Sequence, residues 1–388
     1  MEHKPTVILV SRNFPPLQGG MERLCHHIHQ ELQAEYRVVL VGPDGAERHC
    51  SPESTVRTSP ALPVWRFLAG SLWHCLRLAI LERPAFILAG SGVAALPAVI
   101  TGKLTQTPVV TFLHGLDIVA ANPIYQHVFL PFIRRSSLWL VNSQNTRRLA
   151  IDAGMPAERI EIIHPGTTLP EAMQARERHP LQRWIGEHDG PILLSVGRIT
   201  RRKGLPEFIE QCMPTLIRQL PDILLVVIGD SATHAIGGQS GDAKNGLKRQ
   251  VEAMGLSDHV HILGSVEDTV LDQAYAAANL LIFPVRDLPG DVEGFGMVAV
   301  EAAAHGLPTI AFAAGGVPDA IQNGISGTLV TPGDYGEMTR AILDMIGRKS
   351  ELSSPCRAFA AQFSWPIFGG RLRKILRQRV RHIEERES

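Results

Sequence analysis

Two carboxylates, Glu293 and Glu301, stand with seven residues between them in a stretch where glycines give way to alanines. The glycines predict a loop around Glu293 that exposes backbone N–H groups. The alanines predict a helix that carries Glu301 about two turns later, on a similar face. A helix N-terminus attracts anions, and the loop before it can hold a polar ligand. The pair therefore indicates a site for a sugar attached to a nucleoside diphosphate, although a lone pair of this kind is more often a surface helix with a capping glutamate.

Two cations, Arg198 and Lys203, lie in a loop between Gly197 and Gly204. The loop follows the apolar run Ile192–Val196, and ligands of open parallel sheets bind beyond the carboxyl ends of the strands. Fixed cations there can hold a diphosphate and stabilise its charge as it leaves. The position of the loop favours this interpretation over that of a solvated basic loop.

Two weaker signals follow apolar runs in the first part of the chain. After Thr6–Val10, a Pro-Pro turn leads to Gly19 and Gly20, where glycine lets the backbone approach a phosphate at the start of a helix. Gly-Gly before a helix is, however, often only a turn. After Val109–Leu113, His114 is a candidate polar contact to the substrate, although an isolated histidine is more often structural.

Motifs for other chemistries are missing from the sequence. It contains no D-x-D pair, which argues against a metal-bridged diphosphate, and we expect neither a metal nor a cofactor. Walker and G-x-S-x-G sequences are also missing, so hydrolysis of either type is not indicated. The cysteines form no C-x-x-C pair, so the sequence supports neither a zinc site nor a disulfide framework and fits a reducing cytoplasm. The five cysteines are Cys25, Cys50, Cys75, Cys212 and Cys356.

The bulk composition fits a globular protein of two domains. The chain has 388 residues, 45% hydrophobic and 20% charged, which is too long for one ordinary core. No signal peptide and no apolar stretch long enough to span a membrane is predicted. Net charge is zero, but residues 1–170 carry +3, residues 171–364 carry −7 and residues 365–388 carry +4. The basic ends fit two interpretations equally well: a phosphate-rich or membrane-surface partner, or ordinary solvated charge.

Apolar runs alternate with helical patterns along the whole chain. Runs that are apolar along their length and separated by helices, such as 20–35 and 62–82, predict parallel sheets covered on both faces. The runs form two series, which predicts two doubly wound α/β domains with a cleft between them as the ligand site. The first series is 6–10, 36–41, 85–89, 109–113, 138–141 and 160–163, and the second is 192–196, 223–228, 260–263, 280–283, 309–312 and 327–330.

The same pattern predicts the domain boundaries. We expect an N-terminal domain at 1–170, a polar linker at 171–189 and a C-terminal domain at 190–364. Residues 365–388 are expected to form a basic helix that crosses back to the first domain. The Gly/Ser-rich stretch 236–245 is interpreted as a flexible insertion.

One segment has the composition of a membrane-surface helix. Residues 63–78 mix aromatic, aliphatic and basic side chains at near-helical spacing, which is typical of a helix in a membrane interface and equally of a core helix. Arg134, Arg135 and the basic tail at 371–381 would add attraction to anionic lipid.

Taken together, these motifs resemble those of the retaining glycosyltransferases of family 4, which have the GT-B fold. The resemblance covers nearly the whole chain and implies two Rossmann-like domains that face a central cleft. The first domain would take the acceptor and the second the nucleotide-sugar donor. The matching segments are the Pro-Pro…Gly19-Gly20 loop, His114-Gly115, Gly197-Arg198…Lys203-Gly204, Glu293-Gly294-Phe295-Gly296…Glu301, Gly315-Gly316-Val317-Pro318 and Phe363-Ser364-Trp365.

The resemblance also implies roles for individual residues. Arg198 and Lys203 would bind the donor diphosphate, Glu293 would lie by the donor sugar, and Glu301 would bond the ribose hydroxyls. The resemblance implies front-face attack, in which the leaving phosphate helps to deprotonate the acceptor and Glu293 is not a nucleophile. The other implied site residues are His114 near the transferred sugar and the donor-binding residues Gly19, Gly20, Val266, Gly294, Phe295 and Gly296.

The stretch 283–294 is most similar to GDP-mannose-dependent mannosyl- and rhamnosyltransferases, such as the phosphatidylinositol mannoside mannosyltransferases. This similarity implies transfer of a hexose from a GDP-sugar to a glycan or lipid-linked acceptor, in lipopolysaccharide, O-antigen or other cell-envelope synthesis. The implied location is the cytoplasm, peripherally on the inner face of the membrane, with an anionic membrane surface as a partner and no nucleic acid.

Several alternatives stay open from the sequence. A UDP-sugar-dependent transferase, a sugar-nucleotide epimerase and a non-catalytic sugar-nucleotide-binding protein share this architecture. A binding protein that had lost activity should lack one of the motif residues, and none is missing. A phosphorylase would need a pyridoxal-phosphate lysine, for which no candidate stands out, and a Rossmann dehydrogenase would need G-x-G-x-x-G after the first strand.

Overall fold

The computed structural model describes residues 4–170, 181–231 and 243–387. Contacts divide the chain into two compact units. Unit 1 contains residues 1–166, 289–294 and 365–388, and unit 2 contains residues 167–288 and 295–364. The expected linker at 171–189 and the expected insertion at 236–245 lie partly outside the described residues. The division after Gly166 lies close to the expected end of the first domain at residue 170, and the short stretch 289–294 joins unit 1 from within the expected second domain.

The described part of unit 1 contains a parallel sheet of seven strands. They are β1 (Thr6–Val10), β2 (Arg37–Pro43), β3 (Thr55–Ser59), β4 (Phe86–Ala89), β5 (Val109–Leu113), β6 (Leu138–Val141) and β7 (Ile160–Ile162), in the spatial order β3-β2-β1-β4-β5-β6-β7. In the centre, Ile8 pairs with Val39 on one side and Ile87 on the other, and all three are fully buried. Strands covered on both faces need apolar residues throughout, which explains the continuous apolar runs.

Strand β3 is the one strand of unit 1 that the apolar pattern does not predict. It pairs only with β2 at the edge of the sheet, and most of its side chains are partly exposed. An edge strand in this position tolerates the polar residues Thr55, Arg57 and Thr58, so its sequence lacks the apolar run of the central strands.

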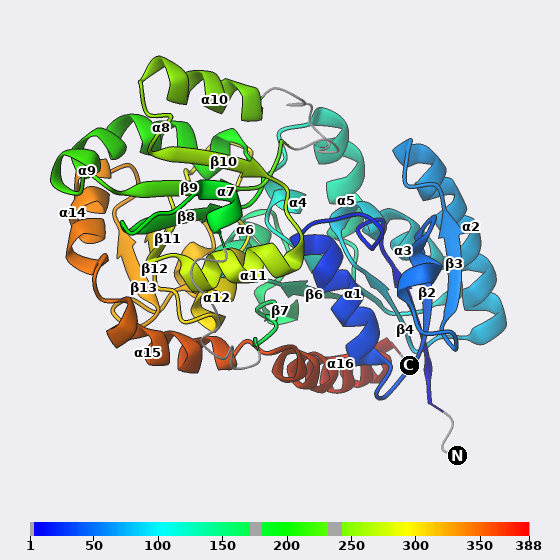
Figure 1. Cartoon of the computed structure of the whole chain (residues 1–388). Helices are drawn as coiled ribbons and strands as arrows, with labels where there is room; N and C mark the ends of the chain where they lie inside the picture. The colour runs from blue at the N-terminus through cyan, green and yellow to red at the C-terminus, as the bar shows by residue number, and fades with distance from the viewer. Residues whose placement is uncertain (1–3, 171–180, 232–242, 388) are drawn as a thin grey trace. The chain divides into compact units, whose positions relative to one another are not determined.

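Helices cover both faces of the sheet in unit 1 (Figure 1). Because parallel crossovers are right-handed, α1, which leads from β1 outward to β2, lies on one face, and α2 and α3, which lead inward past β4 to β5, lie on the other. The helical elements are α1 (Gly20–Leu32), η1 (Ala46–His49), α2 (Val64–Glu82), α3 (Gly92–Thr105), α4 (Leu116–Val119), the π-helical turn η2 (Tyr125–Phe129), α5 (Leu130–Ile133), α6 (Gln144–Asp152), η3 (Ala157–Arg159) and α16 (Trp365–Glu387).

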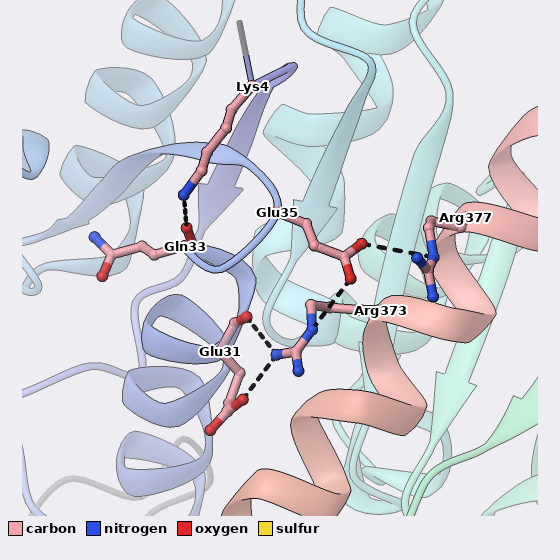
Figure 2. Close-up of polar contacts among 6 residues, drawn as sticks. All are labelled: Lys4, Glu31, Gln33, Glu35, Arg373 and Arg377. Carbon is pink, nitrogen blue, oxygen red and sulfur yellow. Dashed lines mark hydrogen bonds and ion pairs between the residues drawn. The ribbon is translucent and has the colours of Figure 1, made fainter. Parts of the chain in front are cut away.

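The terminal helix α16 packs against α1, within unit 1 (Figure 2). Arg373 Nη1 donates to the backbone carbonyl of Glu31 at 2.7 Å and to its Oε2 at 2.8 Å. Glu35 forms ion pairs with both Arg373 and Arg377 at 3.5 Å. On the same helix, the Trp365 ring stacks on the His27 imidazole with centroids 3.7 Å apart. These contacts hold the chain's last helix on its first domain.

The described part of unit 2 contains a second parallel sheet, of six strands. They are β8 (Ile192–Val196), β9 (Leu224–Ile228), β10 (Val260–Gly264), β11 (Leu280–Phe283), β12 (Thr309–Phe312) and β13 (Gly327–Val330), in the order β10-β9-β8-β11-β12-β13. All six coincide with runs that the sequence pattern predicts, within one residue at each end. The reversal of direction between β8 and β11 is the point at which open sheets of this kind bind ligands.

The helices of unit 2 enclose one continuous apolar core around this sheet. In neither unit is a described helix long and apolar enough to cross a membrane. The helical elements are α7 (Gln182–Ile185), η4 (Arg201–Lys203), α8 (Leu205–Gln211), α9 (Met213–Gln219), α10 (Ala243–Ala253), α11 (Asp268–Ala277), α12 (Met297–Ala304), α13 (Val317–Ala320), α14 (Tyr335–Met345) and α15 (Lys349–Ala361).

Candidate active site

The basic loop begins where the carboxyl ends of β8 and β9 are held together by two glycines. A Cβ on Gly229 would lie 2.0 Å from the carbonyl oxygen of Gly197, which no side chain could tolerate. Gly197 itself has a φ of +129°, a region that L-residues rarely adopt. Its N–H donates to the Ile228 carbonyl at 2.9 Å, and the Ile199 N–H donates to the Asp230 carbonyl at 2.9 Å. These close contacts fix the point at which the loop leaves the sheet.

Lys203 is held at this edge by Phe283 at the end of β11. Its Nζ lies 4.6 Å from the centroid of the Phe283 ring, a cation–π distance, and 3.8 Å from the position of a Cβ on Gly197. Gly204 ends the basic turn at φ +67°, where a Cβ would lie 2.0 Å from the Pro284 carbonyl oxygen. The turn is therefore packed directly against the end of β11, with the ammonium group between the two strands.

Arg198 is exposed in the same loop. The loop is braced from the other side, because the Arg286 N–H donates to the Arg202 carbonyl at 2.8 Å and the Arg286 guanidinium pairs with Glu207. The structure thus places a braced loop with four cationic residues at the carboxyl end of β8.

The same phenylalanine connects this loop with the start of α12. Gly296, the residue before the helix, has a φ of +100°, and a Cβ there would lie 3.0 Å from Cε1 of Phe283. Phe283 therefore contacts both Lys203 and the backbone that begins α12. The basic loop and the helix N-terminus, 92 residues apart from Gly204 to Gly296, meet at one ring.

Glu301 is held inside unit 2 by a tyrosine from α11 and by the histidine that follows α12. Its side chain is only 8% exposed, and the Tyr275 hydroxyl donates to its Oε2 at 3.2 Å. His305 stacks on Tyr275 with centroids 5.0 Å apart, and its Nδ1 hydrogen-bonds the Glu301 carbonyl oxygen at 2.9 Å. A carboxylate with one oxygen fixed in this way is suited to bind vicinal hydroxyl groups in a defined orientation.

Two further predicted donor residues of unit 2 are in contact with its core. Phe295 is buried and its ring contacts that of Phe363, with centroids 5.9 Å apart, while Val266 packs against the core just after β10. Both side chains are therefore held by packing against the core of unit 2.

In unit 1, the loop that carries Glu293 packs on the end of β5. A Cβ on Gly294 would lie 2.2 Å from the His114 carbonyl oxygen and 2.6 Å from Nδ2 of Asn142. A Cβ on Gly115, whose φ is +95°, would lie 3.1 Å from the Val292 side chain. Residues 289–294 thus sit against the strand end that carries His114, and the glycines on both sides allow the close approach.

His114 has a fixed ring orientation. It is buried, stacks on Phe112 with centroids 5.0 Å apart, and its Nε2 lies 2.9 Å from the Gly90 carbonyl oxygen. A carbonyl oxygen only accepts hydrogen bonds, so Nε2 carries the proton and Nδ1 is the acceptor of the neutral ring. The His114 N–H donates to Oδ2 of Asp117 at 3.1 Å, which closes the turn after β5.

The Gly19-Gly20 loop begins α1 without a side-chain cap. A Cβ on Gly19 would lie 2.4 Å from Oε2 of Glu22, whose other oxygen accepts from Asn13 Nδ2 at 2.7 Å. Burial lowers the pKa of the neighbouring Arg12 guanidinium, an effect that the charge of Glu22 partly opposes. Arg12 Nε has no hydrogen-bond partner among the described residues. A buried cation beside an uncapped helix N-terminus is a favourable environment for an anion.

Cysteine nucleophiles are not available at these positions. Burial raises the pKa of Cys25, a buried residue of α1, to about 12, and raises that of Cys75 to about 12 as well. Within the part of the chain that the structure describes, no group of three or more His, Cys, Asp or Glu side chains is placed to hold a metal ion.

Sequence reasoning missed several residues that shape the site. Gly229 belongs to no recognisable sequence motif and is marked only by its place directly after β9. Tyr275 lies in an ordinary amphipathic helix, and nothing in the sequence distinguishes it from a core aromatic residue. Asn142 could have been found, because it directly follows β6 in the same way that His114 follows β5. The predicted residues fall into two groups, each described within its own unit: Arg198, Lys203, Val266, Phe295, Gly296 and Glu301 in unit 2, and Gly19, Gly20, His114, Glu293 and Gly294 in unit 1.

Known structures share this architecture. The structure of Anabaena HepE in complex with UDP and glucose matches with a TM-score of 0.77 at 23% identity, covering 96% of this chain and 100% of that one. A glycosyltransferase from Rickettsia africae matches with a TM-score of 0.78 at 16% identity, covering 97% and 99%. The chain therefore has the GT-B fold, which is built from two Rossmann-like units.

The sequence models of two families match successive parts of the chain. The model described as "Glycosyltransferase Family 4" matches residues 18–169, and the model described as "Glycosyl transferases group 1" matches residues 181–362. The chain therefore belongs to the family 4 glycosyltransferases, as the resemblance of its motifs predicts.

Two curated relatives illustrate the range of the family. The "GDP-mannose-dependent alpha-(1-6)-phosphatidylinositol monomannoside mannosyltransferase" of Mycolicibacterium smegmatis is 24% identical over 95% of this chain and 98% of its own length. The "D-inositol 3-phosphate glycosyltransferase 1" of Catenulispora acidiphila is 30% identical over 61% of this chain. The match spans 56% of that relative, so the chain aligns with about half of its length.

Proposed function

We propose that the protein transfers a hexosyl group, mannose or a related sugar, from a GDP-sugar to an acceptor hydroxyl with retention of configuration at the anomeric carbon. The observation that carries the proposal is the contact of one ring, Phe283, with both Lys203 and the backbone at Gly296. It brings a fixed cation and a helix N-terminus together at the carboxyl edge of the unit 2 sheet. Both features attract the diphosphate of a nucleotide sugar.

In the proposed mechanism, Lys203 and Arg198 bind the diphosphate and stabilise the charge that grows as the bond from the anomeric carbon to the phosphate oxygen breaks. The acceptor oxygen bonds to the anomeric carbon on the same face, and its proton passes to the leaving phosphate oxygen. Glu301 holds the ribose hydroxyls, while Glu293 and His114 position the sugar. No covalent sugar–enzyme intermediate is needed, and Glu293 acts by binding.

The proposal of guanine as the donor base is supported by the relative that aligns over nearly its full length, whose name states dependence on GDP-mannose. A second candidate is a UDP-sugar-dependent transferase, because HepE, which shares the fold, was solved with UDP and with UDP-glucose. We place GDP first because the local stretch 283–294 resembles the GDP-mannose-dependent members.

We further propose a glycan or lipid-linked acceptor in cell-envelope glycolipid or polysaccharide synthesis, with the enzyme acting peripherally on the inner face of the cytoplasmic membrane. The named acceptor class of the same relative, a phosphatidylinositol mannoside, supports the lipid-linked form.

Donor turnover with water as the acceptor tests the reaction without knowledge of the natural acceptor. The enzyme is incubated with GDP-mannose, and the anomer first released is followed by proton NMR. We expect α-mannose and GDP, whereas first release of β-mannose would contradict retention. Lys203→Ala should lower kcat by roughly a hundredfold, the loss typical of one oxyanion contact. Near-normal turnover of this variant at saturating donor would remove Lys203 from the mechanism.

A thermal-shift comparison separates the two donor candidates. A nucleotide that binds the folded state raises the melting temperature by mass action. GDP should raise it and UDP should not, and the reverse result would favour the UDP-sugar alternative.

A further inference from the structure

One helix of unit 1 exposes large apolar side chains along its whole outer side. Trp65, Trp73, Ile80 and Leu81 of α2 are 63%, 65%, 67% and 68% exposed. At 3.6 residues per turn they lie on the same side of the helix as Arg66 and Arg77, which are also exposed. The opposite side, which carries Phe67 and Cys75 among others, is buried against the sheet. We call the six exposed residues the α2 face.

The apolar exposure continues beyond α2 onto its neighbours. Helix α3 packs against α2, and η2 and α5 pack against α3, all on the face of the sheet opposite α1 (Figure 1). Leu104 at the end of α3 is 69% exposed, and Ile124 beside η2 is 67% exposed. Soluble surfaces seldom expose clustered side chains of this size, so such a patch marks a site of interaction.

This region is strongly basic as well as apolar. Residues 54–151 contain nine Lys and Arg and two Asp and Glu, a net charge of +7 in a chain whose total charge is zero. Both acids are already engaged elsewhere. Glu82 pairs with Arg37 at 2.5 Å, and Asp117 is buried, where its carboxylate accepts from the His114 N–H and the Tyr125 hydroxyl. The exposed charge of the region is therefore almost entirely positive.

We propose that the α2 face docks on a membrane surface that contains anionic lipid. Tryptophan and arginine interleaved on one side of a helix match the boundary between acyl chains and anionic headgroups. A second copy of the chain fits less well, because a two-fold interface would set Arg66 and Arg77 against the same arginines with no carboxylate to pair them. The proposal deepens the proposed function by naming the surface that would meet a lipid-linked acceptor.

The basic C-terminal helix is not part of the α2 face. Three of its arginines form ion pairs within unit 1: Arg373 with Glu31, Arg377 with Glu35, and Arg379 with Glu161. Helix α16 also packs on α1, which lies on the face of the sheet opposite α2 (Figures 1 and 2).

Co-sedimentation with vesicles tests the proposal. The full chain is mixed with vesicles of phosphatidylglycerol and phosphatidylcholine, and separately with vesicles of phosphatidylcholine alone. We expect binding to the first only, weakened by added salt and accompanied by a blue shift of tryptophan emission. Arg66→Ala with Arg77→Ala should weaken binding roughly thirtyfold, about fivefold for each basic residue lost near the surface. Trp65→Ser with Trp73→Ser should weaken it by roughly tenfold or more.

Trp184→Ser is the matched control, because Trp184 is an exposed tryptophan of unit 2, 43% accessible. It should bind vesicles like the unaltered chain. Equal loss of binding in this control and in the Trp65/Trp73 variant would overturn the proposal, as would equal binding to neutral vesicles. Dimerisation in sedimentation velocity that is abolished by Trp65→Ser with Trp73→Ser would identify a second copy as the occupant instead.

The proposed function can fail independently of this surface. Donor turnover with water as the acceptor needs no membrane, so the Trp65/Trp73 variant should keep it while losing vesicle binding. Vesicle binding without any donor turnover would refute the proposed function and leave the α2 face standing.

Discussion

Replacing Gly294 with alanine tests how the Glu293 loop is positioned. In the structure, the added Cβ would lie 2.2 Å from the backbone oxygen of His114 and 2.6 Å from Nδ2 of Asn142. Both distances are far below van der Waals contact, and a backbone oxygen at the end of a buried strand cannot rotate away. The loop must therefore move off the end of β5, and Glu293 must move with it.

The expected size of the effect follows from this overlap. Overpacking of this kind costs about 1–3 kcal/mol of unfolding free energy. For a unit of this size the loss corresponds to a fall in melting temperature of roughly 2–10 °C. A displacement of about 1 Å in a positioning group can cost roughly a hundredfold in rate. We therefore expect kcat for donor turnover to fall by roughly that factor, while GDP binding through Lys203 and Arg198 changes little.

Differential scanning calorimetry and steady-state turnover of GDP-mannose measure the two effects. Gly370→Ala in α16 is the matched control, since its Cβ meets no atom within 4 Å. Alanine in place of a helical glycine should stabilise the protein by about 0.5–1 kcal/mol and leave kcat unchanged. A Gly294→Ala enzyme with the original melting temperature and kcat would refute the proposed packing of the loop.

Three further outcomes are expected. Arg373→Ala should lower the free energy of unfolding in urea by about 1–3 kcal/mol, because Arg373 and Glu31 form a partly buried charge-assisted pair (Figure 2). Tyr275→Phe should weaken GDP binding in calorimetric titration by roughly tenfold, because it removes a hydrogen bond that orients Glu301. Burial lowers the pKa of His29 to about 4 from 6.5, so the unfolded chain takes up the proton first as pH falls. Stability should therefore decline by about 3 kcal/mol between pH 6.5 and 4, with no such effect above pH 6.5, and His29→Leu should flatten this decline.

Each of these outcomes has a result that contradicts it. Arg348→Ala removes an exposed i,i+3 pair with Glu351 and should leave the free energy of unfolding almost unchanged. An equal loss of unfolding free energy in the Arg348 and Arg373 variants would contradict the stabilising role of the α16 contact. Unchanged GDP affinity in the tyrosine variant would mean that Glu301 is oriented by other contacts. An unchanged slope of stability against pH in the His29 variant would assign the acid sensitivity to other groups.

The fold was largely predictable because both sheets are buried on both faces. Central strands such as β1 and β9 are apolar along almost their whole length, so an apolar run bounded by turns marks them directly. The same argument could not find β3, since an edge strand with one neighbour needs no such run. It also could not show that the stretch 289–294 packs with unit 1, because that contact joins segments far apart in the sequence through glycine–backbone approach.

Candidate site residues can be proposed from the sequence where chemistry and spacing coincide. Arg198 and Lys203 stand out because they follow an apolar run, and Glu301 stands out because of its spacing from Glu293 in an otherwise apolar helix. Tyr275 and Phe283 could not be singled out, since an aromatic residue in an amphipathic helix or a buried strand looks like core until its polar neighbour is known. The structure shows that such core aromatics are what orient the charged groups.

The central claim is that the strand-end cations of unit 2 hold the diphosphate of a GDP-sugar. Isothermal titration of GDP and UDP into the unaltered protein and into the Arg198→Ala, Lys203→Ala double variant tests it most directly. We predict that the unaltered protein binds GDP more tightly than UDP, and that the double variant binds GDP at least about a hundredfold more weakly, the loss expected for two charge-assisted contacts. Equal GDP affinity in the two proteins would contradict the claim.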